Sequence, residues 1–599
     1  MFSRSLFVKL VILFVSVTLL SHCTKVGENS LQVKPQAATP FTLPTDAYLA
    51  LSKNQSGDEK QTMLIMAAGR ALYDGQWQMA KGILSQTTDL SVTQADEKNI
   101  LLAKIDLARE QPQTAISQLS TVKDRNHLPA FYQGQYHEIL ASSYEAVGNA
   151  SYAVAERIKL EHLLPDEASR LNNRRILWLS LTKLPLPELN TLAVEADEQS
   201  ELQGWMKLAL IPRQASGSEQ SMVAQVEQWQ QRYPEHPANT LLPSPLSAVK
   251  PYLHGAPRQM ALLVPLSGAL AGPGSAVRDG FIAAYNANNP EHNVTIRLYD
   301  TAAHDAASLY QQALAEGADY VVGPLTKNDV VKVASLEHPV PTLLLNDTET
   351  SNNSNAYRFG LSPANEARQV AAKAHKNGFS RALIIAPSGM WGDEIVTAFT
   401  AQWQQGGGEV VERLGFDNNT DLSQAVRDFL HVSEKEAHEK QFKATNPDEQ
   451  IQPKRRQDFD MIFLLAYPSK ARQIVPLLKY YFAGDVPVYA TSSVYSGNTN
   501  TLRDRDLDGI IFCDMPWVFK NQLANKNWPE QLNSYSRLYA LGMDSYTLAN
   551  QFNQLLLFPA MGVNDKNGVL YLNHAQQVAR VLAWGKFKGG IAEQISERI

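Results

Sequence analysis

The stretch Gln259-Met-Ala-Leu-Leu-Val-Pro265 decides the fold class of the C-terminal half of the chain. It is a short apolar run, and the amphipathic stretch 275–288 that follows predicts a helix. The same alternation of a short apolar run and a helix continues along the chain. The further predicted strands are Val294–Tyr299, Tyr320–Gly323, Pro341–Leu345, Arg381–Ala386, Glu409–Leu414, Phe459–Ala466 and Val486–Ala490. Short apolar strands separated by helices indicate parallel sheets that are covered by helices on both faces.

These strands fall into two successive series, which end near residues 345 and 490. Two series predict a bilobal, doubly wound parallel-sheet α/β domain over residues 258–599. In such a domain a ligand binds between the lobes, at the carboxyl ends of the strands. The candidate residues for an inter-lobe cleft are Ser267, Gly268, Ser275 and Tyr467.

The glycine-rich turn 266–275 is the clearest candidate within this cleft. Backbone N–H groups at the start of the predicted helix could hold a carboxylate. The alternative, which we favour, is a structural turn in which Ser275 caps the helix and Gly280 permits close packing. The residues leave open whether a small-molecule ligand binds there.

Residues 46–240 predict a tetratricopeptide-like helical domain with internal repeats. Three units align with offsets of 35 and 38 residues, close to the tetratricopeptide period of about 34. The units are Ala68…Gly75…Ala80, Ala103…Glu110…Ala115 and Ala141…Gly148…Ala153. Such arrays offer a concave surface to another protein, and a plain helical spacer is the alternative. Six prolines between residues 234 and 257 cannot continue a helix, which predicts a linker over 241–257.

The first 22 residues predict a secretory signal. Arg4 and Lys9 precede the apolar run Leu10–Leu20, whose 11 residues are too few for a membrane-spanning helix of about 20. The run ends in Leu20-Ser-His-Cys23, which resembles a bacterial lipobox. The resemblance makes Cys23 the lipid-attachment residue, carrying N-palmitoyl and S-diacylglycerol groups. The alternative is a plain secretory signal with an incidental thiol.

The residues after Cys23 indicate where a lipoprotein of this kind is sorted. Thr24 and Lys25 stand where an aspartate commonly signals retention in the inner membrane, so we expect the outer membrane, with the protein facing the periplasm. Residues 23–45 lack periodicity and carry proline, glycine and polar residues, which predicts a flexible lipidated tether.

Composition and motifs exclude several function classes. The 54 Lys and Arg against 60 Asp and Glu give a net charge of −6, which does not suit nucleic-acid binding. Two cysteines cannot build a disulfide scaffold or an all-cysteine metal site. Zinc-hydrolase, serine-hydrolase and P-loop motifs do not occur in the sequence. We therefore expect no enzyme activity, no cofactor and no metal.

The segment 431–458 is rich in charges of both signs and lies between a predicted helix and the strand beginning at Phe459. Mixed charges usually mark a solvated surface. A loop this long in a compact domain is often functional, so partner docking is the alternative.

Several strings resemble one family, the penicillin-binding protein activator LpoA family of outer-membrane lipoproteins with a type I periplasmic-binding-protein-like domain. The strings are Ala261–Gly268, Gly274–Phe281, Gly317–Leu325, Tyr489–Tyr495, Asp508–Trp517 and Tyr539–Tyr546. The resemblance implies a non-enzymatic regulator of peptidoglycan synthesis. It implies binding and activation of a class A, bifunctional penicillin-binding protein from the periplasmic side.

Two other functions fit the α/β half alone. A lipid-anchored solute receptor for an amino acid or a cell-wall fragment would use the inter-lobe cleft, but it would not need the helical repeats. Repressors of the lactose type share the bilobal fold, yet they begin with a DNA-binding helix-turn-helix. Here an export signal and helical repeats precede the α/β half, so we reject a transcription regulator.

Overall fold

The computed structural model describes residues 40–73, 76–214, 219–288, 293–348, 355–433, 455–521, 535–565, 568–573 and 575–595. Cys23, the predicted tether up to residue 39 and most of the charged segment 431–458 lie outside these residues. Among the helices of the described ranges, none is both long enough and apolar enough to cross a membrane.

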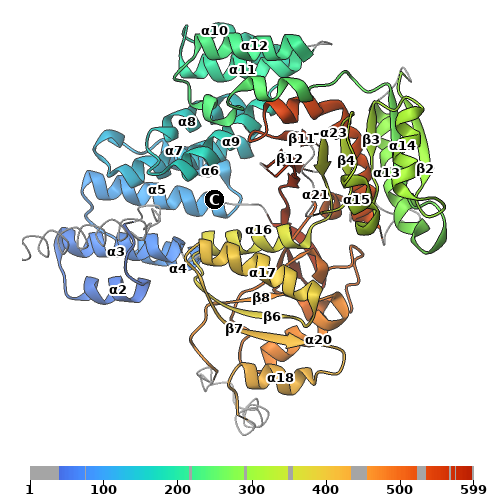
Figure 1. The fold of residues 1–599 in the computed structure, drawn as a ribbon. Coiled ribbons are helices and arrows are strands. Elements are labelled where there is room, and N and C mark those ends of the chain that lie inside the picture. Colours follow the sequence, from blue (N-terminus) through green and yellow to red (C-terminus); the bar gives the residue numbers. More distant parts are fainter. Residues whose placement is uncertain are drawn as a thin grey trace, which may run out of the picture.

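The N-terminal half is built from helices that pack in antiparallel pairs (Figure 1). They are α2 (Thr45–Lys53), α3 (Gly57–Tyr73), α4 (Trp77–Leu84), α5 (Val92–Ala108), α6 (Pro112–Leu119), α7 (Ala130–Ala146), α8 (Ala150–Glu161), α9 (Glu167–Lys183), α10 (Leu186–Glu195), α11 (Glu201–Gln214) and α12 (Glu219–Arg232), with a short turn η1 (Arg125–His127). This helical half confirms the predicted N-terminal part of the fold class.

The alanines of the three predicted repeats lie inside the helix pairs α3–α4, α5–α6 and α7–α8. All six are fully buried, so the small side chains let paired helices approach closely. Gly148, in the turn between α7 and α8, has a φ of +80°. Glu110 occupies the same place between α5 and α6 with a φ of +64°, a conformation that suits glycine better. Gly75, in the turn of the first unit, lies outside the described residues.

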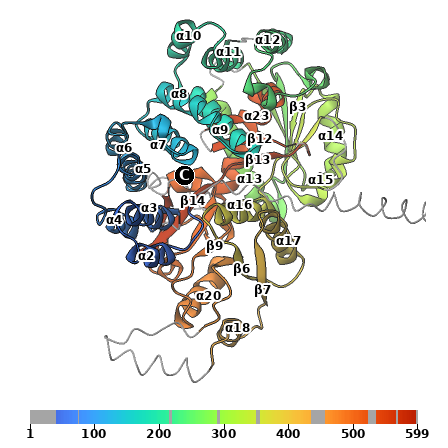
Figure 2. The ribbon, with the colours of Figure 1, turned by 90° about the vertical axis from the view of Figure 1, so that its left-hand side faces the viewer.

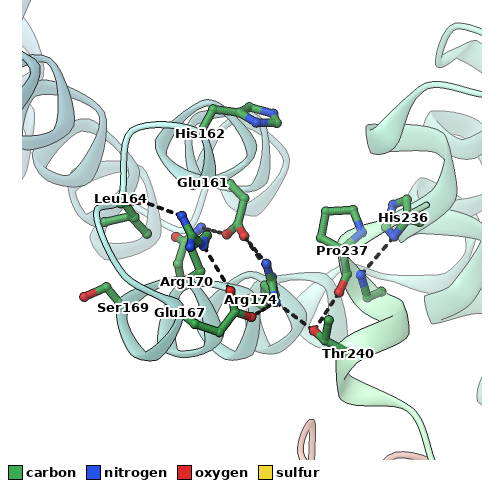
Figure 3. Close-up of polar contacts among 12 residues, drawn as sticks. Glu161, His162, Leu164, Glu167, Ser169, Arg170, Arg174, His236, Pro237 and Thr240 are labelled. Carbon is green, nitrogen blue, oxygen red and sulfur yellow. Dashed lines mark hydrogen bonds and ion pairs between the residues drawn. The ribbon is translucent and has the colours of Figure 1, made fainter. Parts of the chain in front are cut away.

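Between α12 and the first strand the chain forms three short 3-10 turns, η2 (Pro237–Leu241), η3 (Leu246–Ala248) and η4 (Lys250–Tyr252). A buried arginine of α9 fastens this segment to the helices (Figure 3). Arg174 Nε donates to Glu161 Oε1 at 2.8 Å, and its Nη1 donates to Glu167 Oε1 at 2.6 Å and to Thr240 Oγ1 at 2.7 Å. The proline-rich segment is therefore packed against the helical half.

The C-terminal half contains two sheets with parallel cores and one small antiparallel sheet. The five-stranded sheet has the order β2-β1-β3-β4-β5, and all its neighbours pair in parallel. Its strands are β1 (Gln259–Val264), β2 (Thr295–Asp300), β3 (Tyr320–Val322), β4 (Thr342–Leu344) and β5 (Ala356–Arg358). Strands β1 to β4 confirm the first predicted series, and β5 is a further strand that the sequence did not predict.

The seven-stranded sheet has the order β15-β14-β10-β9-β8-β6-β7. Its strands are β6 (Arg381–Pro387), β7 (Glu409–Phe416), β8 (Met461–Leu464), β9 (Val488–Ala490), β10 (Ile511–Asp514), β14 (Ala583–Lys588) and β15 (Ile591–Ile595), and the small sheet comprises β11 (Val563–Asp565), β12 (Gly568–Leu572) and β13 (Val578–Arg580). Strands β14 and β15 add an antiparallel edge that the sequence reading did not assign. The bilobal α/β class is confirmed.

Helices cover both faces of the two main sheets (Figure 2). They are α13 (Ala271–Asn288), α14 (Ala306–Ala315), α15 (Lys327–Ala334), α16 (Pro363–Lys376), α17 (Met390–Gln405), α18 (Leu422–Phe429), α20 (Pro468–Tyr480), α21 (Pro516–Asn521) and α23 (Ser536–Leu557), with short turns η5 (Gly268–Leu270), η6 (Ser492–Val494) and η7 (Asp504–Leu507). Helix α13 begins at Ala271, so Ser275 lies in its second turn and does not cap it, contrary to the structural-turn reading of the sequence.

The chain passes between the two lobes three times. The crossings follow β5, follow β10 and join β13 to β14. After the second crossing, α23 packs along α13 of the first lobe, so a helix that follows β10 of the second lobe completes the first lobe.

The helical half packs against the segment that follows α23. Trp178 of α9 stacks on Phe558, with ring centroids 5.3 Å apart, and Arg175 Nε donates to the carbonyl oxygen of Ala560 at 3.0 Å. Figures 1 and 2 both place α9 beside the small sheet. At the other end of the array, Tyr73 lies close to Gly378, just after α16. The helical half therefore contacts both lobes.

Candidate functional site

Three of the predicted cleft residues lie together at the carboxyl end of β1. Ser267 directly follows this strand region and precedes η5, and Gly268 has a φ of +66°. The Ser267 hydroxyl hydrogen-bonds to Asp300 at the end of β2, and the Leu266 N–H donates to Asp300 Oδ1 at 2.8 Å. These hydrogen bonds hold the pKa of Asp300 below its usual value, and the bond from the Ser267 hydroxyl has the largest effect.

The same turn is closely packed by backbone. A Cβ atom on Gly274 would lie 1.8 Å from the carbonyl oxygen of Pro265, so only glycine fits at this position. Ser275, one residue further along α13, is partly buried. The contacts of this turn therefore give it a structural role: Gly274 allows the close approach to Pro265, and the Ser267 hydroxyl is hydrogen-bonded to Asp300.

Tyr467 belongs to the other lobe. It follows β8, precedes α20 and stacks on Trp391 of α17, with ring centroids 5.1 Å apart and planes 6° apart. Its side chain stays 57% exposed. In the described part of the chain, no hydrogen bond joins Tyr467 to Ser267, Gly268 or Ser275. The structure thus places the candidates at the carboxyl edges of two different sheets.

A cluster of buried charged residues lies at the crossings between the lobes, and the sequence did not predict it. Both carboxyl oxygens of Glu366, on α16, accept hydrogen bonds at 2.8 Å, from the backbone N–H and the hydroxyl of Ser492. Arg537, at the start of α23, donates from Nε to Asp514 Oδ1 at 2.9 Å. Its Nη2 also donates to the carbonyl oxygens of Ser492 and Tyr495, at 3.2 and 3.1 Å.

Each member of this cluster comes from a different part of the second lobe or its crossings. Glu366 follows the first crossing, Ser492 begins η6 just after β9, and Asp514 ends β10 where the second crossing begins. Asp514 is fully buried, and its charge is neutralised by Arg537. The cluster therefore ties two crossings to the carboxyl edge of the seven-stranded sheet.

Burial shapes the acid–base behaviour of the cluster. Desolvation, with a smaller contribution from the neighbouring Asp514 charge, raises the pKa of Glu366 to about 7. Burial likewise raises the pKa of the Cys513 thiol, which keeps it protonated and unreactive. Glu366 thus changes its charge near neutral pH at a point that links the lobes.

The third crossing, between β13 and β14, is bound by one residue of α16 and one of α23. Gln369 Nε2 donates to the carbonyl oxygen of Arg580 at 2.9 Å, and the Leu582 N–H donates to Gln369 Oε1 at 3.1 Å. The Arg580 side chain forms an ion pair with fully buried Asp544 of α23. Helix α16 is thus hydrogen-bonded to η6 through Glu366 and to the third crossing through Gln369, and this arrangement can fix the orientation of one lobe relative to the other.

Two residues of this cluster, Ser492 and Asp514, lie in sequence strings that resemble the family, but nothing in those strings predicts that the two residues share one cluster. Asp514 lies in the string Asp508–Trp517, but Glu366 and Arg537 stand far away along the chain. A charged residue at the end of an apolar strand was the available signal, since buried charges need partners. No local sequence pattern predicts which oppositely charged residue each of these side chains pairs with.

A comparison with known families decides the assignment of the chain. The model of the LppC putative lipoprotein family matches residues 39–590. The chain belongs to this family. The resemblance read from the sequence strings is confirmed.

Relatives named penicillin-binding protein activator LpoA match nearly the whole chain. The Vibrio antiquarius protein is 26% identical over 554 residues, covering 90% of this chain and 92% of the relative. The Photobacterium profundum protein is 27% identical over 587 residues, covering 95% and 94%. The crystal structure of full-length LpoA from Haemophilus influenzae covers 93% of this chain and 99% of its own, with a TM-score of 0.51 and 22% identity, and supports the fold.

Proposed function

We propose that this protein is an outer-membrane lipoprotein that binds and activates a class A penicillin-binding protein from the periplasmic side. The observation that carries the proposal is the match over more than nine tenths of the chain to relatives named penicillin-binding protein activators. The protein itself would be non-enzymatic, in keeping with relatives named as activators.

The architecture suits a regulator that works by binding alone. A partner that binds the active conformation of an enzyme more tightly than the inactive one shifts the enzyme toward activity. Such binding needs a rigid surface of defined shape. The helical half, in contact with both lobes, and the cluster around Glu366 and Arg537 provide that rigidity.

The proposed anchor places the regulator within reach of its partner. Acyl chains on Cys23 would hold the protein at the membrane, because each buried methylene contributes about 0.8 kcal/mol. The tether 23–45 would let the body stand away from the surface, and tethering raises the effective concentration of the protein near its partner.

The activation is tested with purified components. We expect the protein, added to a class A penicillin-binding protein from the same cell, to bind it and to raise its rate of glycan polymerisation or peptide cross-linking. Heat-denatured protein is the control. Absence of both binding and stimulation would contradict the proposal.

The anchor is tested separately in cells. Replacement of Cys23 by serine should release the protein from the membrane fraction. Thr24→Asp should move it to the inner membrane, and Thr24→Asn, which is similar in size but uncharged, should leave it in the outer membrane. A protein that fractionates identically in all three variants would contradict the anchoring proposal while leaving activation untouched.

The second candidate function is a lipid-anchored receptor for an amino acid or a cell-wall fragment. The exposed stack of Tyr467 on Trp391, at the carboxyl edge of the second sheet, is the observation in its favour. Calorimetry with such ligands distinguishes the two functions, because a receptor would show saturable binding that Tyr467→Ala weakens.

A further inference from the structure

An open cavity of about 380 Å³ lies in the helical half, between the α7–α8 turn and the α9–α10 turn. Its size falls within the range of about 300–1,000 Å³ that is usual for small-ligand pockets. It lies outside the inter-lobe region, and all its lining residues belong to the helical half.

A fixed carboxylate contributes to the wall of the cavity. Glu145 Oε1 accepts from Arg157 Nε at 2.7 Å and from the Ser180 hydroxyl at 3.1 Å, while Oε2 accepts only a longer bond of 3.3 Å from Arg157 Nη2. A carboxylate can accept about four hydrogen bonds, so Glu145 retains acceptor capacity. The Arg157 side chain is 2% exposed, and it fixes this carboxylate before any ligand arrives.

Two further charges of opposite sign line the cavity. Lys183 lies at the end of α9, and Glu188 lies in the first turn of α10. Both residues are exposed, and neither forms an ion pair or a side-chain hydrogen bond with another described residue. The cavity therefore combines a free ammonium group with two carboxylates, one of which is already paired.

The remaining lining is small and partly apolar. Val147, Leu184 and Pro185 contribute aliphatic surface between the charged groups. A simple anion would face two carboxylates here, and a metal ion would face the Lys183 ammonium. A ligand that carries both an ammonium and a carboxylate, with a small aliphatic body, complements all these groups.

We propose that this cavity binds a short peptide with free amino and carboxyl termini. Its ammonium group lies against Glu145 and Glu188, and its carboxylate lies against Lys183. Arg157 is a positioning residue that holds Glu145. The proposal stands independently of the activator function, because it concerns a site in the helical half that neither lobe contributes to.

Calorimetric titration of the purified full chain with L-alanyl-L-alanine tests the proposal. We expect saturable binding, and binding about tenfold weaker or worse for the N-acetylated dipeptide and for the dipeptide amide, each of which lacks one charge. Lys183→Met and Glu188→Gln should weaken binding of the free dipeptide to the same degree. Because both side chains are exposed, these variants should fold normally, which thermal unfolding checks.

Matched variants complete the test. Lys53→Met and Glu195→Gln change exposed residues of the same types that do not line the cavity, and they should bind the dipeptide like the original protein. No saturable binding up to about 10 mM dipeptide would overturn the proposal. So would equal binding of the blocked dipeptides, or binding that survives both cavity variants.

Discussion

Gly280 and Gly542 lie at the contact between α13 and α23, and each sits against the backbone of the other helix. A Cβ atom on Gly280 would lie 1.9 Å from the carbonyl oxygen of Tyr539, and one on Gly542 would lie 2.0 Å from that of Val277. The two helices can therefore approach so closely only because both positions are glycine. This contact attaches the returning helix to the first lobe.

Gly542→Ala should separate these helices. The added methyl group meets backbone rather than a movable side chain, so we expect a loss of about 1–3 kcal/mol, or more, in the free energy of unfolding. Denaturant unfolding measures the loss. Gly82→Ala in α4 is the matched control: a Cβ atom there meets nothing within 4 Å, and alanine at this exposed position should stabilise the helix by up to about 1 kcal/mol. Equal effects of the two variants would contradict the close helix contact.

The stack of Trp178 on Phe558 should hold the two halves of the chain together. Both side chains are buried, so Trp178→Ala should cost about 3–5 kcal/mol and separate the unfolding of the helical half from that of the α/β half. The double variant with Phe558→Ala should lose less than the sum of the single losses, by about 0.5–1.5 kcal/mol.

Hydrogen exchange followed along the chain measures this coupling. The variants should raise exchange in α9 and in the segment around Phe558 more than elsewhere. Val194→Ala, at an exposed position of α10, should change neither exchange nor stability. Additive losses for Trp178 and Phe558 would show that the rings do not interact.

Strands and repeats were predictable because their signals are local. Each buried parallel strand is an apolar run, and each helix pair carries an alanine where the partner approaches. The start of α13 was misread because Gly272, Pro273 and Gly274 look like a turn. Proline is tolerated in a first helical turn, where its missing N–H has no partner anyway, and Gly274 is required by the carbonyl oxygen of Pro265.

The ionic cluster was not predictable for a different reason. Glu366, Ser492, Asp514 and Arg537 meet only after both sheets and all three crossings are in place. Polar partners at such separations depend on topology, and the order of the strands in the second sheet has no local signature. Tyr467 shows the same limit, because its stack on Trp391 joins the ends of two different strands.

Glu366 should make stability depend on pH near neutrality. Its pKa is raised from 4.5 to about 7 in the folded protein, so the folded state holds its proton more tightly than the unfolded state does. This contribution to stability is therefore complete below pH 4.5 and is lost as the pH rises through about 7. Glu366→Gln, which is neutral at every pH, should remove the decline.

Unfolding midpoints measured from pH 4 to pH 8 provide the test. Glu138→Gln, which changes a carboxylate outside the cluster, is the control and should keep the decline of the original protein. A Glu366→Gln variant whose pH profile is parallel to that of the original protein would contradict the raised pKa of this carboxyl group.

His236 should produce the opposite pH dependence in the helical half. Burial lowers its pKa from 6.5 to about 4. Its Nδ1 accepts a hydrogen bond from the Ala238 N–H at 3.1 Å, and its Nε2 hydrogen-bonds to the Glu201 carbonyl oxygen at 2.9 Å, so the ring is held neutral. Its contribution to stability is complete above pH 6.5 and is lost as the pH falls toward about 4.

The loss should amount to about 3 kcal/mol across that interval, since each pKa unit corresponds to about 1.4 kcal/mol. His236→Asn removes the titration and keeps an acceptor for the Ala238 N–H, whereas His304→Asn changes an exposed histidine and should keep the slope. Glu366 and His236 have opposite effects on stability over a shared pH range. The quantity to compare is therefore the difference in the free energy of unfolding between each variant and the original protein at each pH. A His236→Asn difference that does not change between pH 4 and pH 6.5 would contradict a neutral, buried ring.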